Sequence, residues 1–464
     1  MQTSKEKSSR TELKRALGPW AAASIVVGTV IGSGIFLVPR TMIQRVGSVE
    51  MVFAVWVVGG LLSMAGALSY AELAAALPEA GGEYAFLREA YGPMWGFLYS
   101  WTQTWVAKSG SIATLATGFF LYLTTFFEPL KGVIYTVPLP IGPNGGPLEI
   151  QYGQLFAIAL IMGLAWLNYF GVKIGGNVQV AVTVLKVALI AAIVLAGLFL
   201  GEAHAPAAAT ISPLTFSGFI AALVAALWAY DGWNNVSMVS SEIKDPQRNL
   251  PRALIGGTLT VVAIYMLANL AYFRVLAPAE VAGSTRVAAE MMRKLVGNEG
   301  AGAVAIAAMI SIFAALNGSI LSGARVPYAA ARDGYFFRKM ARVHPQHHTP
   351  GTAIIILNLW ACFLVLSGKY DDLFNLVIFA SWILYGMTAA AVVVLRYKQP
   401  GLVRPYRTLG YPIIPLLFIA GAIILLFSTL IERPRESVMG LGVMALGLPF
   451  YHYWKRQKSD NNAL

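Results

Sequence analysis

The chain has 464 residues, of which 57% are apolar and only 12% are charged. Soluble globular domains carry about 25% charged residues, so this chain has too few charges to cover a water-facing surface. Its mean hydropathy of +0.65 and its 12% aromatic content also exclude a disordered protein. The composition therefore predicts an all-α integral membrane protein that crosses the bilayer several times, with about 20 apolar residues in each span.

The net charge of +12 and the isoelectric point of about 9.6 do not indicate nucleic-acid binding in such a chain. Basic residues of membrane proteins collect in cytoplasmic loops and set the topology. The first 16 residues are polar and basic, so they predict no cleavable signal peptide. Cys362 is the only cysteine and lies in an apolar segment, which rules out an intramolecular disulfide.

Apolar segments separated by proline, glycine and charged residues predict twelve transmembrane helices. Their approximate limits are 18–45, 50–77, 94–126, 151–169, 177–200, 218–242, 253–275, 301–332, 352–367, 372–396, 412–430 and 435–454. We place the N-terminus in the cytoplasm and count residues at span ends with the adjoining segments. Inside segments then hold 21 lysines and arginines, outside segments hold 10, and the span interiors hold three. This bias predicts that both termini are cytoplasmic.

The first predicted span contains Gly28, Gly32, Ser33 and Gly34 within seven residues. Each glycine destabilises a helix by about 1 kcal/mol relative to alanine. A broken helix at membrane depth is tolerated only where it faces protein or a cavity. The N–H groups freed at the start of its second half form a natural anion site. Alternatively, Gly28 and Gly32 have the spacing of a close-packing surface, for which Gly34 is not needed.

The sixth predicted span contains Asp231, Gly232 and two asparagines at membrane depth. A charged residue there is a functional hypothesis by default; alternatively, Asp231 is structural and pairs with a lysine or arginine. Interrupted helices at matching positions in two halves indicate the binding site of an inverted-repeat transporter. N–H groups from the first break and carbonyls from the second suit a zwitterion, with its carboxylate at the first and its ammonium at the second.

Other signals are weaker. His344, His347 and His348 lie in a proline-containing loop without metal-ligand spacing, so we predict neither a metal site nor a cofactor. No catalytic motif is present, and we do not expect an enzyme. The charged loop 242–252 is either a salt-bridged loop or an inner gate.

Several stretches carry a resemblance to a known family. They are VGTVIGSGIF (27–36), LPEAGGEYAFLREAYG (77–92), AYDGWNNVSMVSSEIKDPQRNLPRA (229–253), NGSILSGARVPYAAARDGYF (317–336), HPQHHTP (344–350) and LRYKQPGLVRPYR (395–407). With these stretches in this order, the chain resembles the amino acid–polyamine–organocation superfamily and, within it, the L-type amino acid transporter branch. The resemblance implies a LeuT-like fold. Residues 18–200 and 218–396 then form two inverted five-helix repeats, 412–454 form accessory helices 11 and 12, and 1–17 and 455–464 form cytoplasmic tails.

The resemblance also implies a substrate site. The substrate carboxylate would lie at Gly32, Ser33 and Gly34, just after Thr29 and Val30. Its ammonium would meet carbonyls of the second break. The residues expected there are Trp228, Ala229, Asp231 and Trp233. Tryptophan at 228, where relatives often have phenylalanine, would fill more of the pocket and favour small substrates. Asp231 leaves the choice between neutral and cationic substrates open.

Two lysines lie inside predicted spans. Lys186 resembles the lysine whose ammonium replaces sodium in the sodium-independent members of the family, and Ser319 or Ser322 is expected to give it a hydroxyl partner. A buried lysine needs such partners or loses its proton; the alternative is a lysine that extends to the cytoplasmic surface. Lys108 matches a position that is basic in several relatives, where it would line the outer path or pair with an acid.

The resemblance implies a sodium-independent secondary transporter, an exchanger of small neutral L-amino acids that works by alternating access. The alternatives are a proton-coupled permease for cationic amino acids or polyamines, which would use Asp231 and a titrating Lys186, and a membrane-embedded amino acid sensor. The loop 128–150 has no cysteine, so we expect no disulfide-linked heavy chain. The expected partners are the amino acid and the lipid bilayer, and the expected location is a bacterial inner membrane.

Overall fold

The computed structural model describes residues 12–138, 146–202, 213–367, 370–432 and 434–463. Within these residues the chain is helical apart from its loops and one antiparallel hairpin of β1 (Val133–Val137) and β2 (Leu148–Gln151). Seven described helices are long and apolar enough to cross a membrane, and one bent pair adds an eighth candidate span. The all-α membrane class is therefore confirmed, whereas the count of twelve spans stays a prediction.

The helices of the first half begin shortly after the described N-terminus. They are α1 (Pro19–Val30), α2 (Gly34–Val46), α3 (Val49–Ala76), α4 (Glu83–Tyr91), α5 (Pro93–Thr102), the π-helical turn η1 (Gln103–Ala107), α6 (Lys108–Leu123), the 3₁₀ turn η2 (Glu128–Lys131), α7 (Tyr152–Tyr169) and α8 (Val172–Phe199). The π-helical turn falls inside the predicted third span, where it joins α5 to α6.

The helices of the second half vary widely in length, from the 4 residues of α10 to the 30 of α11. They are α9 (Phe216–Ala229), α10 (Asn235–Met238), the 3₁₀ turn η4 (Ser240–Glu242), α11 (Pro246–Val275), α12 (Pro278–Gly283), α13 (Val287–Val296), α14 (Asn298–Gly323), α15 (Arg325–Arg332), the 3₁₀ turn η5 (Arg338–Ala341), α16 (Gly351–Leu366), α17 (Tyr370–Lys398), α18 (Ile413–Glu432), α19 (Pro434–Ala445) and α20 (Gly447–Ala463).

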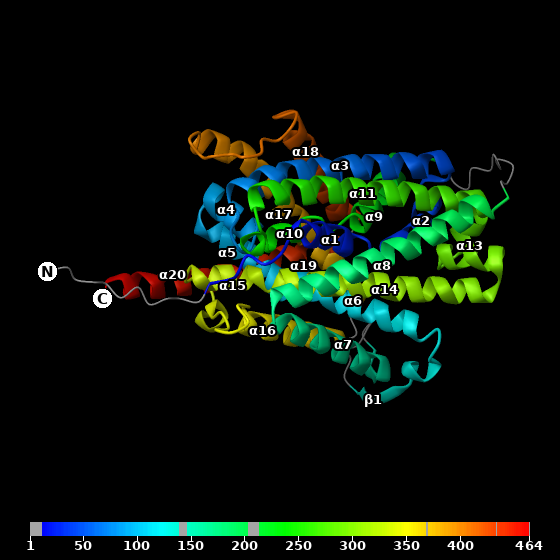
Figure 1. Cartoon of the computed structure of the whole chain (residues 1–464), viewed down its shortest axis with the longest axis horizontal. Coiled ribbons are helices and arrows are strands. Elements are labelled where there is room, and N and C mark those ends of the chain that lie inside the picture. Colours follow the sequence, from blue (N-terminus) through cyan, green and yellow to red (C-terminus); the bar gives the residue numbers. More distant parts are fainter. Residues whose placement is uncertain (1–11, 139–145, 203–212, 368–369, 433, 464) are drawn as a thin grey trace.

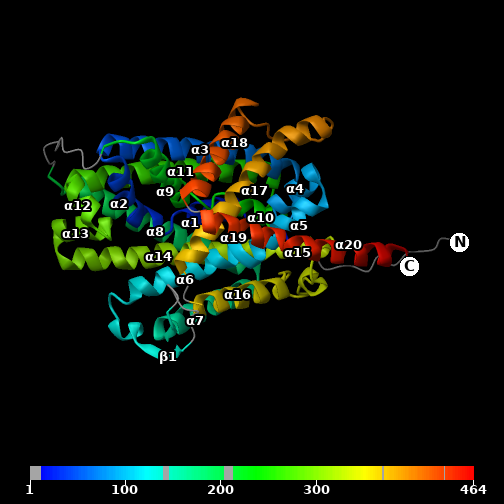
Figure 2. The ribbon, with the colours of Figure 1, turned by 180° about the vertical axis from the view of Figure 1, so that it is seen from behind.

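The bundle places the interrupted helices near its centre (Figure 1). Helix α1 contacts α8, α11 and α14, while α9 contacts α2 and α3. Helices α3 and α11 lie side by side along one face, and α7 and α16 pair along the opposite face. Helices α4, α5, α15 and α20 gather at one end of the molecule, and α12 and α13 lie at the other (Figures 1 and 2).

The outer surface of the bundle carries large apolar side chains. Exposed examples on six different helices are Leu61, Trp166, Val184, Leu259, Phe363 and Phe427. An apolar surface of this extent would drive a water-soluble protein to aggregate. It is the surface expected of helices that face lipid tails.

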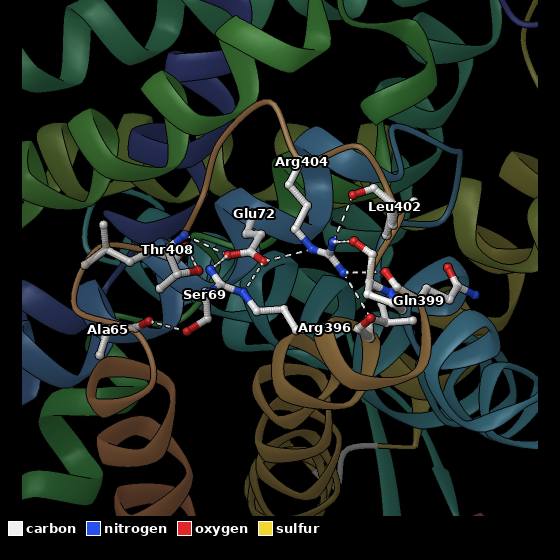
Figure 3. A network of polar contacts seen from close by, with 11 residues as sticks. Ala65, Ser69, Glu72, Arg396, Gln399, Leu402, Arg404 and Thr408 are labelled. Carbon is white, nitrogen blue, oxygen red and sulfur yellow. Dashed lines mark hydrogen bonds and ion pairs between the residues drawn. The ribbon is translucent and has the colours of Figure 1, made fainter.

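Glu72, near the end of α3, binds the loop that follows α17 (Figure 3). Its carboxylate accepts hydrogen bonds from Arg396 at 2.9 and 2.6 Å and from the Thr408 N–H at 2.7 Å, and Arg404 lies 3.4 Å away. Arg404 also donates to the carbonyls of Leu395 and Gln399 at the end of α17. This network fixes α17, which forms one wall of the candidate site, against α3.

Candidate substrate site

The first predicted span is interrupted where the sequence indicates. Helix α1 ends at Val30, α2 begins at Gly34, and their axes differ by 42°. Gly28, before the break, serves the alternative role of close packing: a Cβ there would lie 2.1 Å from the Gln179 amide nitrogen on α8. Gly32, the other residue of the expected packing pair, has no such close contact, since the nearest atom to a Cβ there would be 3.9 Å away on Leu115.

The sixth predicted span is also interrupted. Helix α9 ends at Ala229 and α10 begins at Asn235. Gly232, between them, has a φ of 111°, which L side chains rarely adopt, and a Cβ there would come within 3.2 Å of the Thr29 backbone. Glycine at this position lets the second break approach the first.

The two breaks contact each other directly. The Thr29 hydroxyl lies 2.8 Å from the Gly232 carbonyl oxygen, and a Cβ at Gly34 would lie 2.9 Å from the Cβ of Ala229. The Tyr265 hydroxyl of α11 lies 3.1 Å from the Val30 carbonyl and 2.8 Å from the Ala229 carbonyl. Sequence reasoning missed Tyr265; the only available signal was a tyrosine in an apolar span, where its hydroxyl needs a partner.

Lys186 is fully buried on α8 and meets the first break. Its ammonium donates to the carbonyl oxygens of Gly28 at 2.7 Å, Ile31 at 2.5 Å and Ser311 at 3.2 Å. An ammonium has three hydrogens to donate, and all three have carbonyl acceptors here. The side chain therefore does not extend to the surface, and its buried terminal nitrogen lies where α1, α8 and α14 meet.

Ser319 and Ser322, the serines expected beside Lys186, are not its partners among the described contacts. Ser322 donates to the Gly318 carbonyl within its own helix, whereas Ser311 contacts Lys186 and donates to the Ile31 carbonyl at 2.9 Å. Ser311 and Ser322 are separated by about three turns and share one face of α14. The sequence therefore predicts the face of α14 that meets Lys186, but not the turn of the helix at which they meet.

A cavity of about 60 Å³ lies next to the second break. Its walls come from η1, α6, the break itself and α17, through Gln103, Ala107, Lys108, Ser111, Thr114, Trp228, Asp231, Ser381, Trp382 and Tyr385. Of the predicted substrate-binding residues, it includes Trp228 and Asp231. The α17 wall and the π-helical turn have no signal in the sequence that points to a cavity.

The other predicted residues lie around this cavity without lining it. Thr29, Val30, Gly34 and Ala229 lie at the junction of the two breaks, whereas Gly32 and Ser33 lie in the first break without a described contact to the second. The Trp228 ring touches both places, because it lines the cavity and approaches the Gly34 position to 3.6 Å. Trp233 does not face this cavity. It is 4% exposed and packs edge-on against Tyr70 and Phe418, because the turn at Gly232 directs it away.

Two charged side chains face the cavity. Asp231 is exposed to it and accepts a hydrogen bond from the Tyr385 hydroxyl at 3.0 Å. Lys108 is 7% exposed, and its ammonium donates to the Asn235 side-chain carbonyl at 2.6 Å. The described residues show no ion pair within 4.0 Å between these two side chains, although each lies in the electrostatic field of the other.

Glu83, at the start of α4, is a fully buried carboxyl group that sequence reasoning missed. It accepts hydrogen bonds from the Asn234 amide and, at 3.3 Å, from the Ser237 hydroxyl. Burial away from water raises the pKa of the Glu83 carboxyl above its usual range, which favours the protonated form. Glu83 thus connects α4 to the second break through hydrogen bonds.

Because burial favours the protonated form of the Glu83 carboxyl, Glu83→Gln is expected to leave the melting temperature close to that of the wild type. Glu83→Ala leaves the buried Asn234 amide without its acceptor, which costs about 1–3 kcal/mol, whereas the Ser237 hydroxyl keeps the Asn234 carbonyl 2.6 Å away. Thermal unfolding of the purified variants in detergent measures both. A Gln variant as unstable as the Ala variant would show that Glu83 works as a charged group.

The end of the bundle that holds α4, α15 and α20 is closed by polar contacts. Arg325 and Glu242, both fully buried, form a bidentate ion pair with distances of 2.6 and 3.0 Å. The N–H groups of Ala16 and Leu17 bind the Glu242 carbonyl, both at 2.9 Å. The loop that begins at Glu242 is therefore tied by an ion pair to α15 and by backbone bonds to the N-terminal segment.

A second ion-pair network lies at the same end. Arg88 of α4 contacts Asp333 at 2.6 Å and Glu79 at 3.0 Å, and the Tyr84 hydroxyl contacts Asp333 at 2.9 Å.

In the part of the chain that the structure describes, no three histidine, cysteine, aspartate or glutamate side chains group closely enough to hold a metal ion. The rings of His344 and His347 stack instead, with centroids 4.4 Å apart.

Comparison with known proteins identifies the family of the chain. The family model described as amino acid permease matches residues 17–443. The chain is 34% identical to the serine/threonine exchanger SteT of Bacillus subtilis, over 97% of this chain and 98% of that protein. It is 30% identical to the mouse b(0,+)-type amino acid transporter 1 and 32% to the mouse large neutral amino acids transporter small subunit 2. Those matches cover 95% and 96% of this chain, and 88% and 82% of the two mouse proteins. The chain therefore belongs to the amino acid permease family of the amino acid–polyamine–organocation superfamily, with the L-type amino acid transporters among its relatives.

Proposed function

We propose that this protein is a sodium-independent exchanger of small neutral L-amino acids that works by alternating access. The observation that carries the proposal is the Lys186 ammonium, which three carbonyl oxygens hold at the first break. A permanent ammonium supplies the positive charge that sodium brings in sodium-coupled relatives. The junction of the breaks is then complete without a coupling ion.

The two interrupted spans support a LeuT-like inverted repeat over 18–200 and 218–396, with 412–454 as accessory helices. Substrate sites of such transporters lie where discontinuous helices from the two repeats meet. The N–H groups at the start of α2, from Gly34 onward, suit a carboxylate. The carbonyls at the end of α9, Trp228 and Ala229 among them, suit an ammonium.

The size of the cavity favours a small substrate. About 60 Å³ holds roughly four water molecules, which is room for a short side chain and not for a long or aromatic one. Trp228 fills part of the space beside the breaks. The similarity to a protein named as a serine/threonine exchanger points to the same substrate class.

One observation favours a second candidate, a proton-coupled permease for cationic amino acids. Asp231 exposes a carboxylate to the cavity, where it would meet a cationic side chain or carry a proton. A membrane-embedded amino acid sensor is the alternative from another functional class. We infer in addition that the protein lies in a bacterial inner membrane with both termini in the cytoplasm. It works without a disulfide-linked heavy chain, since its one cysteine is buried in α16.

Proteoliposome transport separates these functions. We expect sodium-free uptake of labelled serine into vesicles preloaded with unlabelled serine, and little uptake into empty vesicles, with no response to an imposed proton gradient. Uptake into empty vesicles that rises with an inward proton gradient would establish the proton-coupled permease. Serine binding without uptake under any of these conditions would establish the sensor.

A further inference from the structure

Lys108 and Asp231 bring opposite charges to the walls of one small cavity. Lys108 begins α6, next to the π-helical turn, while Asp231 lies in the break between α9 and α10. Placing a charged side chain at membrane depth costs free energy, so an isolated charge there needs a balancing charge nearby.

The direct hydrogen-bond partners of both groups are neutral. The Lys108 ammonium donates to the Asn235 amide oxygen, and the Asp231 carboxylate accepts from the Tyr385 hydroxyl. Among the described ion pairs, neither residue contacts a third charged group within 4.0 Å. Glu83 is the other carboxyl group that acts on Lys108, but it does not line the cavity, and its carboxylate binds Asn234 and Ser237 instead. Lys108 and Asp231 therefore balance each other across the cavity.

We propose that Lys108 determines the charge selectivity of the substrate site, by neutralising Asp231 so that the cavity accepts uncharged side chains and rejects cationic ones. The inference rests on the proposed function as an amino acid exchanger and names the residue that restricts its substrates. A lysine or arginine substrate would add a second positive charge beside the Lys108 ammonium, and like charges at short range in a partly desolvated site repel strongly. Without Lys108, the Asp231 carboxylate is free to pair with the side chain of such a substrate.

The test is competition with serine exchange in proteoliposomes. Lys108→Met keeps an unbranched side chain but removes the charge. The measured quantity is the inhibition of labelled-serine exchange by arginine, divided by the inhibition by threonine. We expect this ratio to be at least about tenfold higher in Lys108→Met than in the wild type. Lys108→Arg keeps the charge and should retain the wild-type profile. Lys108→Met combined with Asp231→Asn should lose the gain for arginine. Lys173→Met, at an exposed lysine of α8, is the matched control.

The reciprocal variant tests the same pair from the other side. Asp231→Asn leaves the Lys108 ammonium unbalanced, so aspartate should compete with serine at least about tenfold better than in wild type. A merely structural role of Lys108 as donor to Asn235 predicts weaker transport in Lys108→Met with an unchanged order of substrates. That result would overturn the inference, as would an Asp231→Asn variant that gains no competition by aspartate.

Binding keeps the inference testable if transport is lost. Substrate-induced shifts in the melting temperature of purified protein rank arginine, threonine and aspartate without requiring exchange. If Lys108→Met does not fold, the aspartate result with Asp231→Asn decides alone. A wild-type protein that exchanges no neutral amino acid overturns the proposed function, whereas normal wild-type exchange with unchanged variant selectivity overturns only the role of Lys108.

Discussion

Lys186→Met is expected to reduce amino acid exchange at least about tenfold while a folded protein still reaches the membrane. The substitution removes an ammonium that three carbonyl oxygens hold. At the first break, the Gly28 carbonyl loses this donor, and the Ile31 carbonyl keeps only the Ser311 hydroxyl. The break then loses the charged contact that joins α1 to α8 and α14. Because the site around Lys186 is closed to water, no solvent molecule replaces the missing donor without rearrangement.

The measurement is serine counterflow into proteoliposomes, normalised to the amount of reconstituted protein. Lys173→Met is again the control. Lys173 is exposed on the same helix, so this variant should exchange serine at the wild-type rate. Gel filtration in detergent separates a failure of transport from a failure to fold. Exchange at the wild-type rate by a folded Lys186→Met protein would remove the cation role.

Arg325→Met is expected to give the largest loss of stability, about 3–5 kcal/mol, since it leaves the Glu242 carboxylate buried without its partner. Both side chains are fully buried, and the guanidinium also donates to the Leu321 carbonyl at 2.5 Å. Glu242→Gln should destabilise for the reciprocal reason. The double variant Glu242→Gln with Arg325→Met removes both charges and should recover part of the loss, because no unpaired ion remains.

Thermal unfolding in detergent, followed by gel filtration of heated samples, measures this series. Arg338 is exposed and begins the 3₁₀ turn that follows α15 in the sequence. Arg338→Met is therefore expected to have the melting temperature of the wild type. A double variant that is less stable than both single variants would contradict the ion-pair explanation. Exchange assays on the stable members of the series would show whether the pair also controls opening at this end.

The sequence predicted the membrane class and both helix interruptions because each leaves a local signal. Three glycines and a serine in the first span, and Asp231 with Gly232 in the sixth, are residues that a continuous apolar helix does not accept. The helix limits were less accurate. Helix α11 begins at Pro246, seven residues before the predicted span at 253, because a helix continues into the polar turn where hydropathy already falls.

Other features required the tertiary structure. Ser311 and Ser322 share a face of α14, and only the packing of α14 against α1 decided which of them meets Lys186. Tyr265 contacts both breaks through a hydroxyl whose partners lie 235 and 36 residues away. Trp233 points away from the cavity because of the backbone conformation at Gly232. The pattern of side chains along the sequence does not predict this direction.

The sequence by itself determined that this protein lies in a membrane, where its helices break, and which family it resembles. These properties depend on composition and on residues next to one another in the chain. The tertiary structure decided which carbonyls hold Lys186, that Lys108 and Asp231 share one cavity, and that Arg325 and Glu242 are paired. Those contacts join side chains far apart in the sequence, and their geometry depends on the depth and rotation of each helix, which apolar periodicity leaves free.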